Sequence, residues 1–329
     1  MGGPALKGVG ETKLLRQFAE LAALGPRSSP LGPGDDAAGL GLAGGGLGLW
    51  TIDSLVEGID FGRDFQGPYQ LGRKAWRVAA SDLAAMGARP EAGLAAALLP
   101  PGTSARAVAA IQLGLVEAAA EDGASLVGGD LSATAGPLAL TVSAWAQLWN
   151  RAPVRLGGGR AGEALIVTGA LGGAAGALAL LQSGLEPPSQ LRARLCDPPS
   201  RGAAGEALAR AGASAMTDLS DGLVLDLGRL CASSGQGAEL WLDHLPLEAE
   251  LADRLPDRAR ELALSGGEDF ELLASLPRDR LGELRRAWSS ELPALSEIGE
   301  LSADPGVRLW SRPGGEQVPA PGRSGFRHF

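Results

Sequence analysis

The 329-residue chain is poor in the side chains on which several enzyme classes depend. It has two cysteines, Cys196 and Cys231, and two histidines, His244 and His328. These are too few for a structural zinc site of the usual spacing, and they argue against a disulfide framework. Neither histidine lies near a GxSxG motif, so the sequence does not predict a Ser-His-Asp hydrolase.

Lysine is also scarce, and acidic residues outnumber basic ones. The three lysines are Lys7, Lys13 and Lys74, and none follows a glycine-rich GxxxxGK[ST] loop, so any phosphate chemistry is not of the P-loop kind. The formal net charge is −9. A surface of that sign repels nucleic-acid phosphates and anionic lipids, so we expect neither as a partner. It attracts cations instead.

Long hydrophobic segments are rare as well. The uncharged stretch 164–182 reaches the length of a membrane span. Its pattern changes midway, however, from a short apolar strand (165–167) through a glycine-rich loop (169–176) to a short helix (177–181). With no secretory signal pattern near the first methionine, we expect a cytoplasmic protein without a membrane partner.

What is present indicates an α/β fold. Apolar residues make up 45% of the chain and charged residues 20%, which is typical of a globular protein with a sizeable core. Alanine- and leucine-rich segments with helical spacing alternate with short apolar runs typical of strands. The predicted helices are 75–86 and 105–120, and the predicted strands are 47–50, 93–99 and 138–146.

The composition changes to arginine, glycine and proline without apolar periodicity at residues 150–162. Such a stretch is typical of a linker, and a strand at 165–168 and further helices follow it. The length fits one large or two medium domains. We therefore predict two domains, 1–149 and 150–329.

Acidic residues recur beside glycine or another small residue, at the predicted ends of apolar elements. Such carboxylates can project into a cleft where a ligand approaches the backbone. Two carboxylates about 4 Å apart repel each other by roughly 4 kcal/mol at an effective dielectric constant near 20. Converging acids therefore take up protons or bind cations, and oxygen ligands without Cys or His favour Mg²⁺ bridging to substrate phosphates. The motifs are Gly34-Asp35-Asp36, Ile52-Asp53-Ser54, Ser81-Asp82-Leu83, Gly128-Gly129-Asp130, Asp218-Leu219-Ser220-Asp221-Gly222 and Gly267-Glu268-Asp269.

Each motif taken alone has a simpler explanation. A lone Asp beside Gly is usually a turn residue. The segment 218–222 does not fit a calcium-binding EF-hand loop, because Arg229 stands where the bidentate Glu belongs. Ser220 or Asp221 can be the N-cap of the next helix, and that same helix terminus favours phosphate, so both interpretations stay open.

In series, these segments resemble the thiamine-monophosphate kinase family, in a superfamily that includes aminoimidazole ribonucleotide synthetase and selenophosphate synthetase. The resemblance spans nearly the whole chain, and seven motifs with fitting gaps are specific where one is not. The matching segments are Gly34–Ala38, Thr51–Gly58, Ser81–Ala88, Val127–Asp130, Asp218–Leu223, Leu264–Leu272 and Gly325–Phe329.

The resemblance implies a two-domain, aminoimidazole ribonucleotide synthetase-like α/β (α+β) fold. N-terminal sheets would pair across a homodimer, and the C-terminal α/β domain would close over the cleft. It implies Mg²⁺-dependent, in-line transfer of the ATP γ-phosphoryl group to thiamine monophosphate, giving thiamine diphosphate and ADP. No side chain would act as a covalent catalyst, since several Mg²⁺ ions would assist direct transfer.

The resemblance also implies roles for individual residues. The metal ligands would be Asp36, Thr51, Asp53, Asp82, Asp130, Asp218 and Asp221. ATP would contact Gly129, Asp130, Arg155 and Ser220, and thiamine monophosphate would contact Asp60, Glu268 and Phe326. On the residues alone, Arg155 can equally be a solvated linker arginine, Glu268 a turn carboxylate and Phe326 a buried tail aromatic.

The chain departs from the family pattern at four places without losing a predicted metal-binding aspartate. Ile52 replaces a threonine, Asp60 a histidine, Phe270 a tyrosine, and Leu131-Ser132 a threonine pair. Two alternatives stay open: an ATP-dependent ligase like aminoimidazole ribonucleotide synthetase, or a non-catalytic protein that binds nucleotide or thiamine phosphate. Selenophosphate synthetase is disfavoured because the first cysteine is Cys196.

Overall fold

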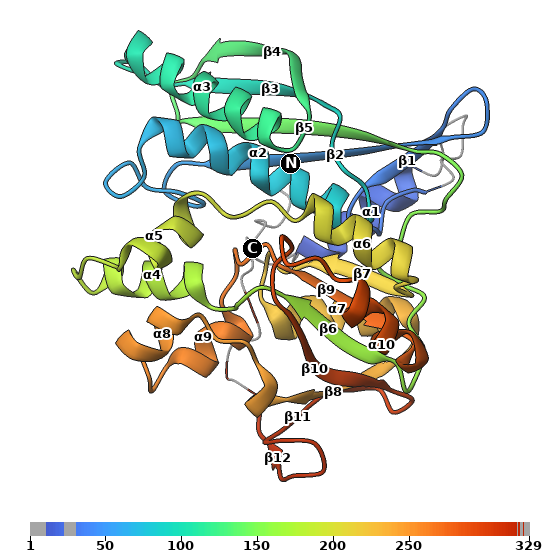
Figure 1. The fold of residues 1–329 in the computed structure, drawn as a ribbon. Helices are drawn as coiled ribbons and strands as arrows, with labels where there is room; N and C mark the ends of the chain where they lie inside the picture. The colour runs from blue at the N-terminus through green and yellow to red at the C-terminus, as the bar shows by residue number, and fades with distance from the viewer. Residues whose placement is uncertain (1–10, 23–30, 321, 323–324, 326–329) are drawn as a thin grey trace, which may run out of the picture.

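The computed structural model describes residues 11–22, 31–320, 322 and 325. Within them the chain forms two β-sheets, one in each half, with helices packed against both (Figure 1). The mixed α/β class expected from the sequence is confirmed. Phe326, a predicted substrate contact, lies outside the described residues.

The N-terminal half contains a five-stranded sheet within the described residues, in the order β1-β2-β5-β3-β4. Neighbouring strands are antiparallel, except that β3 and β4 are parallel. The strands are β1 (Ala38–Gly41), β2 (Leu47–Val56), β3 (Ala92–Leu99), β4 (Ser125–Ala133) and β5 (Ala139–Leu148). The helices are α1 (Glu11–Ala22), α2 (Pro68–Ala85) and α3 (Ala105–Glu121).

Strand alternation explains which face of this sheet carries the core. On β5 every second residue, including Leu140 and Val142, is buried against α2, whose Trp76 and Leu83 are fully buried. Ser104 is the N-cap of α3, since its hydroxyl accepts a hydrogen bond from Ala107 N at 3.1 Å.

The opposite face of the sheet carries exposed apolar side chains. Exposed fractions are 45% for Trp50, 68% for Ile52, 49% for Leu94 and 45% for Leu98. Trp50 also faces Trp145, with ring centroids 6.1 Å apart. Helices α2 and α3 therefore cover one face of the sheet, while large apolar groups on the other face stand open.

The C-terminal half contains a seven-stranded sheet within the described residues, in the order β12-β11-β8-β10-β6-β9-β7. Its neighbours are antiparallel except β8 and β11. The strands are β6 (Ala164–Thr168), β7 (Ala215–Asp218), β8 (Gly237–Trp241), β9 (Leu272–Leu276), β10 (Leu295–Ser302), β11 (Gly306–Trp310) and β12 (Gln317–Val318). The helices are α4 (Gly173–Gln182), α5 (Ser189–Cys196), α6 (Gly202–Ala211), α7 (Leu223–Ser234), η2 (Leu242–His244), α8 (Ala249–Arg254), α9 (Ala259–Ser265) and α10 (Arg278–Ala287).

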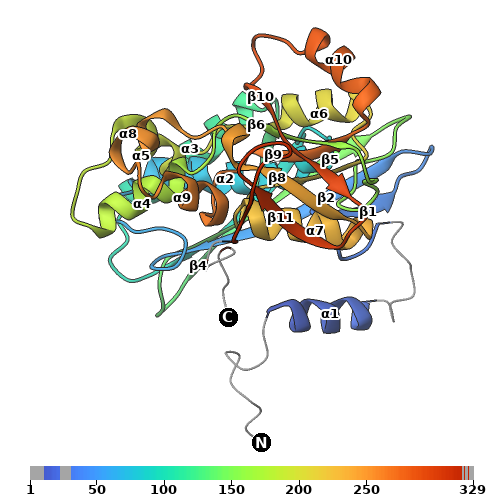
Figure 2. The same cartoon turned by 90° about the horizontal axis from the view of Figure 1, so that it is seen from below.

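Three apolar clusters hold this half together. Leucines of α7 pack with β6 and β8, while α6 and α10 pack on a second cluster with β7 and β9. Helices α4, α5, α8 and α9 gather at one end with a core of their own (Figure 2). The stretch 164–182 folds as β6, a loop and α4, as its changing pattern predicts. Among the described helices, none combines the length and apolar character needed to cross a membrane.

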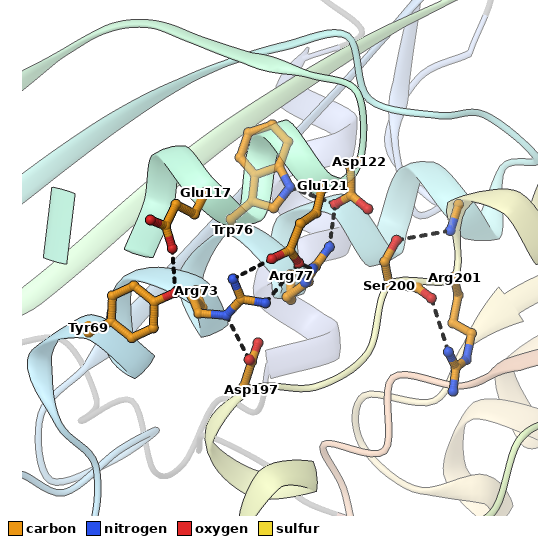
Figure 3. Close-up of polar contacts among 11 residues, drawn as sticks. Tyr69, Arg73, Trp76, Arg77, Glu117, Glu121, Asp122, Asp197, Ser200 and Arg201 are labelled. Atoms are coloured by element: carbon orange, nitrogen blue, oxygen red, sulfur yellow. Dashed lines mark hydrogen bonds and ion pairs between the residues drawn. The ribbon is translucent and has the colours of Figure 1, made fainter. Parts of the chain in front are cut away.

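Helix α2 joins the two halves through an ion-pair network (Figure 3). Arg73 donates from Nε to Asp197 Oδ2 at 2.6 Å, in the segment after α5, and from Nη1 to Glu121 Oε1 on α3 at 2.8 Å. Arg77 Nη1 lies 2.8 Å from Asp122 Oδ2 at the end of α3. These contacts fix the orientation of α2 relative to both halves.

One prediction about the acidic motifs is wrong for two of them, which do not stand at the ends of elements. Asp53 lies within β2 and Asp130 lies within β4, whereas Asp82 is in the last turn of α2 and Asp218 ends β7. Gly128 and Gly129 do not end β4, because sheet hydrogen bonds join backbone groups and continue through residues without side chains. A Cβ atom on Gly129 would lie 2.0 Å from Ala95 O, so glycine permits the close approach of β3 there.

Candidate active site

Three predicted metal ligands meet between the two halves of the chain. Oxygen atoms of Asp36, Asp82 and Asp218 all lie within 4.8 Å of one another. Asp36 precedes β1, Asp82 is in the last turn of α2, and Asp218 ends β7. The packing of α2 against β7 therefore builds a cluster from the acids of both halves. Asp36 and Asp82 come from the N-terminal half, and Asp218 comes from the C-terminal half.

Hydroxyl groups orient two of these carboxylates. Ser81 Oγ donates to Asp218 Oδ2 at 2.6 Å, linking α2 directly to β7. Thr217 Oγ1 donates to Asp36 Oδ1 at 3.1 Å, whereas Asp36 Oδ2 is buried without a hydrogen-bond partner among the described residues. A buried oxygen without a donor costs free energy unless a proton or a cation occupies it.

Strand β2 adds two more predicted ligands beside Asp82. Thr51 Oγ1 donates a hydrogen bond to Asp82 Oδ2. Asp53, two residues further along, projects from the same face of β2 by strand alternation, and its carboxyl group hydrogen-bonds with that of Asp82. The structure thus groups Asp36, Thr51, Asp53, Asp82 and Asp218.

Burial and mutual repulsion change the protonation of this cluster. Burial, followed by the charges of neighbouring aspartates, holds the pKa of Asp36 and of Asp82 well above the ordinary value of 3.8. Burial likewise raises the pKa of Asp218 to about 7, against the lowering effect of the Ser81 hydrogen bond. Burial also raises the pKa of Asp53, to which Asp60 contributes.

These donors fit a hard divalent cation. Carboxylate and hydroxyl oxygens without Cys or His are the ligands preferred by Mg²⁺. Asp36 Oδ2, which accepts no hydrogen bond from the part of the chain that the structure describes, offers a lone pair to such an ion. A cation would also remove the repulsion among the acids. Which of them ligate an ion remains a prediction.

The loop before α7 carries Asp221 and is anchored by a residue that sequence reasoning missed. Asp226 Oδ2 accepts hydrogen bonds from Asp221 N and Gly222 N, both at 3.0 Å. Burial raises the pKa of Asp226 to about 7. The expected N-cap is wrong: Gly222, at φ 120°, occupies that position, and no side chain caps the helix there. Asp226, in the first turn of α7, instead holds the segment before the helix through the amides of Asp221 and Gly222. Arg229 Nη1 lies 2.7 Å from Asp221 Oδ2.

The predicted ATP contact Arg155 lies beside the cluster. Its Nε donates to Asp35 Oδ2 at 2.9 Å, and Asp35 Oδ1 accepts from Leu156 N at 2.8 Å. More than half of the Arg155 side chain is exposed. Asp35, adjacent to Asp36, thus aims a guanidinium that is still accessible to an anion.

Gly129 and Asp130 are not brought into this group. Asp130 pairs with Ala96 on β3, and its Oδ2 accepts a hydrogen bond from Ser132 Oγ at 2.8 Å. By strand alternation it lies on the open face with Leu94 and Leu98. Its predicted roles in binding metal and ATP stay predictions.

The two described residues predicted to contact the substrate meet at Lys74. Lys74 Nζ lies 2.6 Å from Glu268 Oε1 and 3.1 Å from the carbonyl oxygen of Asp60. The Asp60 carboxylate itself accepts from Val56 N at 2.7 Å. Sequence reasoning overlooked Lys74, which stands one residue before the predicted helix 75–86. The helix in fact begins at Pro68, so Lys74 lies two turns before Ser81 on the same helix.

Comparison with known proteins places the chain. Residues 34–147 match the family model for the AIR synthase related protein N-terminal domain, and residues 160–311 match that for the C-terminal domain. A thiamine-monophosphate kinase of Mycobacterium tuberculosis is 38% identical over 277 residues, covering 80% of this chain and 82% of that protein. The chain belongs to the thiamine-monophosphate kinase family.

Other members of the thiamine-monophosphate kinase family extend the match. The thiamine-monophosphate kinase of Salmonella typhimurium is 35% identical over 301 residues, which cover 90% of this chain and 91% of that protein. A solved structure described as AaThiL complexed with AMPPCP and TMP superposes with a TM-score of 0.85 at 28% identity, covering all of both chains. The resemblance stated from the sequence motifs is confirmed.

Proposed function

We propose that this protein transfers the γ-phosphoryl group of ATP to thiamine monophosphate and releases thiamine diphosphate and ADP. The observation that carries the proposal is the convergence of Asp36, Asp82 and Asp218 from both halves of a thiamine-monophosphate kinase fold. Phosphoryl transfer requires mainly positioning and neutralisation of charge, and a cluster of carboxylates that holds cations supplies both.

The roles proposed for individual residues follow their positions. Asp36, Thr51, Asp53, Asp82 and Asp218 hold Mg²⁺, and Asp221 extends this set at the anchored loop before α7. When bound, the metal neutralises the charge on the phosphates. Arg155, held by Asp35, and Ser220 contact ATP, together with Gly129 and Asp130.

The substrates are inferred from chemistry and from the relatives. AMPPCP in the AaThiL complex is a non-hydrolysable analogue of ATP, and the TMP bound with it supports thiamine monophosphate as the acceptor. Glu268 offers a carboxylate to the cationic thiazolium or the aminopyrimidine. We further propose that Asp60 and Phe326 contribute to that site, and that residues 1–149 and 150–329 are the two domains that enclose it.

The test is to incubate the purified protein with Mg-ATP and thiamine monophosphate and to follow both products by chromatography. We expect thiamine diphosphate and ADP to appear in equimolar amounts. ADP alone would indicate hydrolysis or another acceptor, and the substrate of an aminoimidazole ribonucleotide synthetase-like ligase would be tried next. Saturable binding without either product would support the non-catalytic alternative.

We also propose that the protein is a homodimer whose N-terminal sheets pair through their open faces. This face carries Trp50, Ile52, Leu94 and Leu98 in one exposed patch. Exposed apolar clusters of this kind on a sheet are typical of interaction surfaces. Asp130 lies on the same face, so pairing would bring this predicted ATP contact to the interface.

Replacing Leu94 by Glu is expected to convert the dimer to monomer, because it places a charge within the apolar patch. Light scattering should report about twice the 33.3 kDa chain mass for the wild type and about one chain mass for the variant. Leu185→Glu is the matched control, since Leu185 is similarly exposed in the loop after α4. A wild-type protein of one chain mass at micromolar concentration would contradict the dimer.

A further inference from the structure

Lys74 is a fully buried cation at the junction of the two halves. Its exposed fraction is 0%, and it lies in the middle of α2 among the apolar residues of the N-terminal core. Lysine is rarely buried to this extent without a partner, because removing an ammonium group from water costs several kcal/mol. Here the partner is the Glu268 carboxylate at 2.6 Å, the single ion pair of Lys74 among the described residues.

The same ammonium group also holds the segment that follows β2. Nζ donates to the carbonyl oxygen of Asp60 at 3.1 Å. Phe61, the next residue, is buried in the N-terminal core, which fixes that segment. Lys74 therefore ties a rigid part of the N-terminal half to Glu268, which belongs to the C-terminal half.

The backbone of Glu268 is hydrogen-bonded to Ser220, and its carboxylate has a single polar partner among the described residues. Glu268 has φ +67°, in the left-handed region that is uncommon for residues other than glycine, and Phe270 has φ +48°. Its amide donates to Ser220 O at 2.8 Å, which attaches the loop to the predicted ATP-binding segment. Among the described residues, the side chain makes one polar contact, through Oε1 to Lys74. Oε2 accepts no hydrogen bond there.

We propose that Lys74 is a positioning residue for the acceptor substrate. It fixes Glu268 through Oε1 and leaves Oε2 to accept a hydrogen bond from an amine-bearing or cationic heteroaromatic ligand. The inference rests on the proposed function, in which Glu268 contacts thiamine monophosphate. It also accounts for the burial of a lysine in α2, since an apolar residue there would leave the Glu268 carboxylate half-buried and unpaired.

The experiment compares Lys74→Met, Glu268→Gln and the double variant with the wild type. Methionine keeps the length of the side chain and removes the charge. Arg73→Met is the matched control, because Arg73 is the neighbouring cation on α2 and joins the two halves through Asp197 rather than Glu268. The readouts are KM for each substrate, kcat, calorimetric binding of thiamine monophosphate, and Tm.

We expect Lys74→Met to raise KM for thiamine monophosphate and weaken its binding by about tenfold or more, with KM for ATP changed less than about twofold. Because Lys74 acts through Glu268, Lys74→Met should add little in the Glu268→Gln background. Arg73→Met should lower Tm without raising KM for thiamine monophosphate. If the Lys74–Glu268 ion pair were purely structural, Lys74→Met would lower Tm as Arg73→Met does and would leave KM for thiamine monophosphate unchanged.

Several results would overturn the proposal. They are an unchanged KM in Lys74→Met, equal effects on both substrates, or additive effects in the double variant. If Lys74→Met does not fold, Glu268→Gln decides, since an unaltered KM in that variant removes the group through which Lys74 acts. A wild type that makes no product refutes the proposed kinase activity, but calorimetry still tests the role of Lys74. Weaker binding of thiamine monophosphate to Lys74→Met than to the wild type supports that role. No binding of thiamine monophosphate to the wild type overturns it.

Discussion

Asp82→Asn is expected to lower phosphoryl transfer by at least about a thousandfold while raising the Tm of the metal-free protein. The two effects have one cause. The carboxylate of Asp82 faces those of Asp36, Asp53 and Asp218, and burial and repulsion hold its pKa well above 3.8. At neutral pH the buried carboxyl group must either stay ionised or take up a proton, and both lower the free energy of unfolding. An uncharged amide at this position does not have that cost.

The loss of activity follows from the same carboxylate. If Asp82 holds Mg²⁺ against the phosphates, an uncharged amide binds the ion far more weakly and leaves the developing charge poorly neutralised. The gain in stability should be a few kcal/mol at most, and about 2 kcal/mol would raise Tm by roughly 3 °C in a chain of this size. Opposite signs of the two effects are characteristic of a functional site that is strained without its ligand.

Two matched variants separate these effects. Asp130→Asn removes an exposed carboxylate outside the cluster, so we expect no gain in Tm. We still expect slower phosphoryl transfer, because Asp130 is a proposed contact of metal and ATP. Asp243→Asn removes an exposed acid paired with Arg260, far along the chain in η2, and should change neither activity nor Tm by much. Near-normal activity of Asp82→Asn in saturating Mg²⁺ would remove this residue from the metal site.

The sequence was sufficient for several elements and for most of the cluster. A short apolar run predicted β5, helical spacing predicted α3 and the C-terminal part of α2, and the change of pattern in 164–182 separated β6 from α4. The aspartates were identified because their motifs recur in a fixed order. That information is local, and it does not depend on how the two halves pack.

The remaining features depend on packing between residues far apart in the chain. Lys74 and Glu268 are 194 positions apart, and their ion pair exists because α2 lies against the C-terminal half. Asp226 belongs to none of the sequence motifs, and only the fold shows that its carboxylate holds the loop that carries Asp221. The predicted N-cap, Ser220 or Asp221, is wrong because the helix begins after Gly222. The glycines before Asp130 predict the end of a strand there, whereas β4 continues to Ala133.

The stability of the metal-free protein should fall as pH rises from about 4 to about 7, as far as the buried aspartates determine it. The folded-state pKa values of Asp218 and Asp226 are raised to about 7, and those of Asp36 and Asp82 are also well above 3.8. Between the unfolded and folded values, the folded state binds more protons than the unfolded state. The free energy of unfolding therefore decreases with pH across that interval.

Magnesium should reverse this loss of stability. The gain in the free energy of unfolding should be larger at high pH, because only ionised carboxylates bind the metal well. We expect saturating MgCl₂ to raise Tm at about pH 8 by roughly 3 °C or more beyond the rise at about pH 5. The difference in Tm between metal-bound and metal-free protein at each pH removes the contribution of groups that titrate outside the cluster. NaCl of equal ionic strength controls for electrostatic screening. Asp82→Asn should reduce the gain at pH 8. Equal Mg²⁺ effects at both pH values would mean that the ion binds elsewhere, because binding at these carboxylates must compete with their protons.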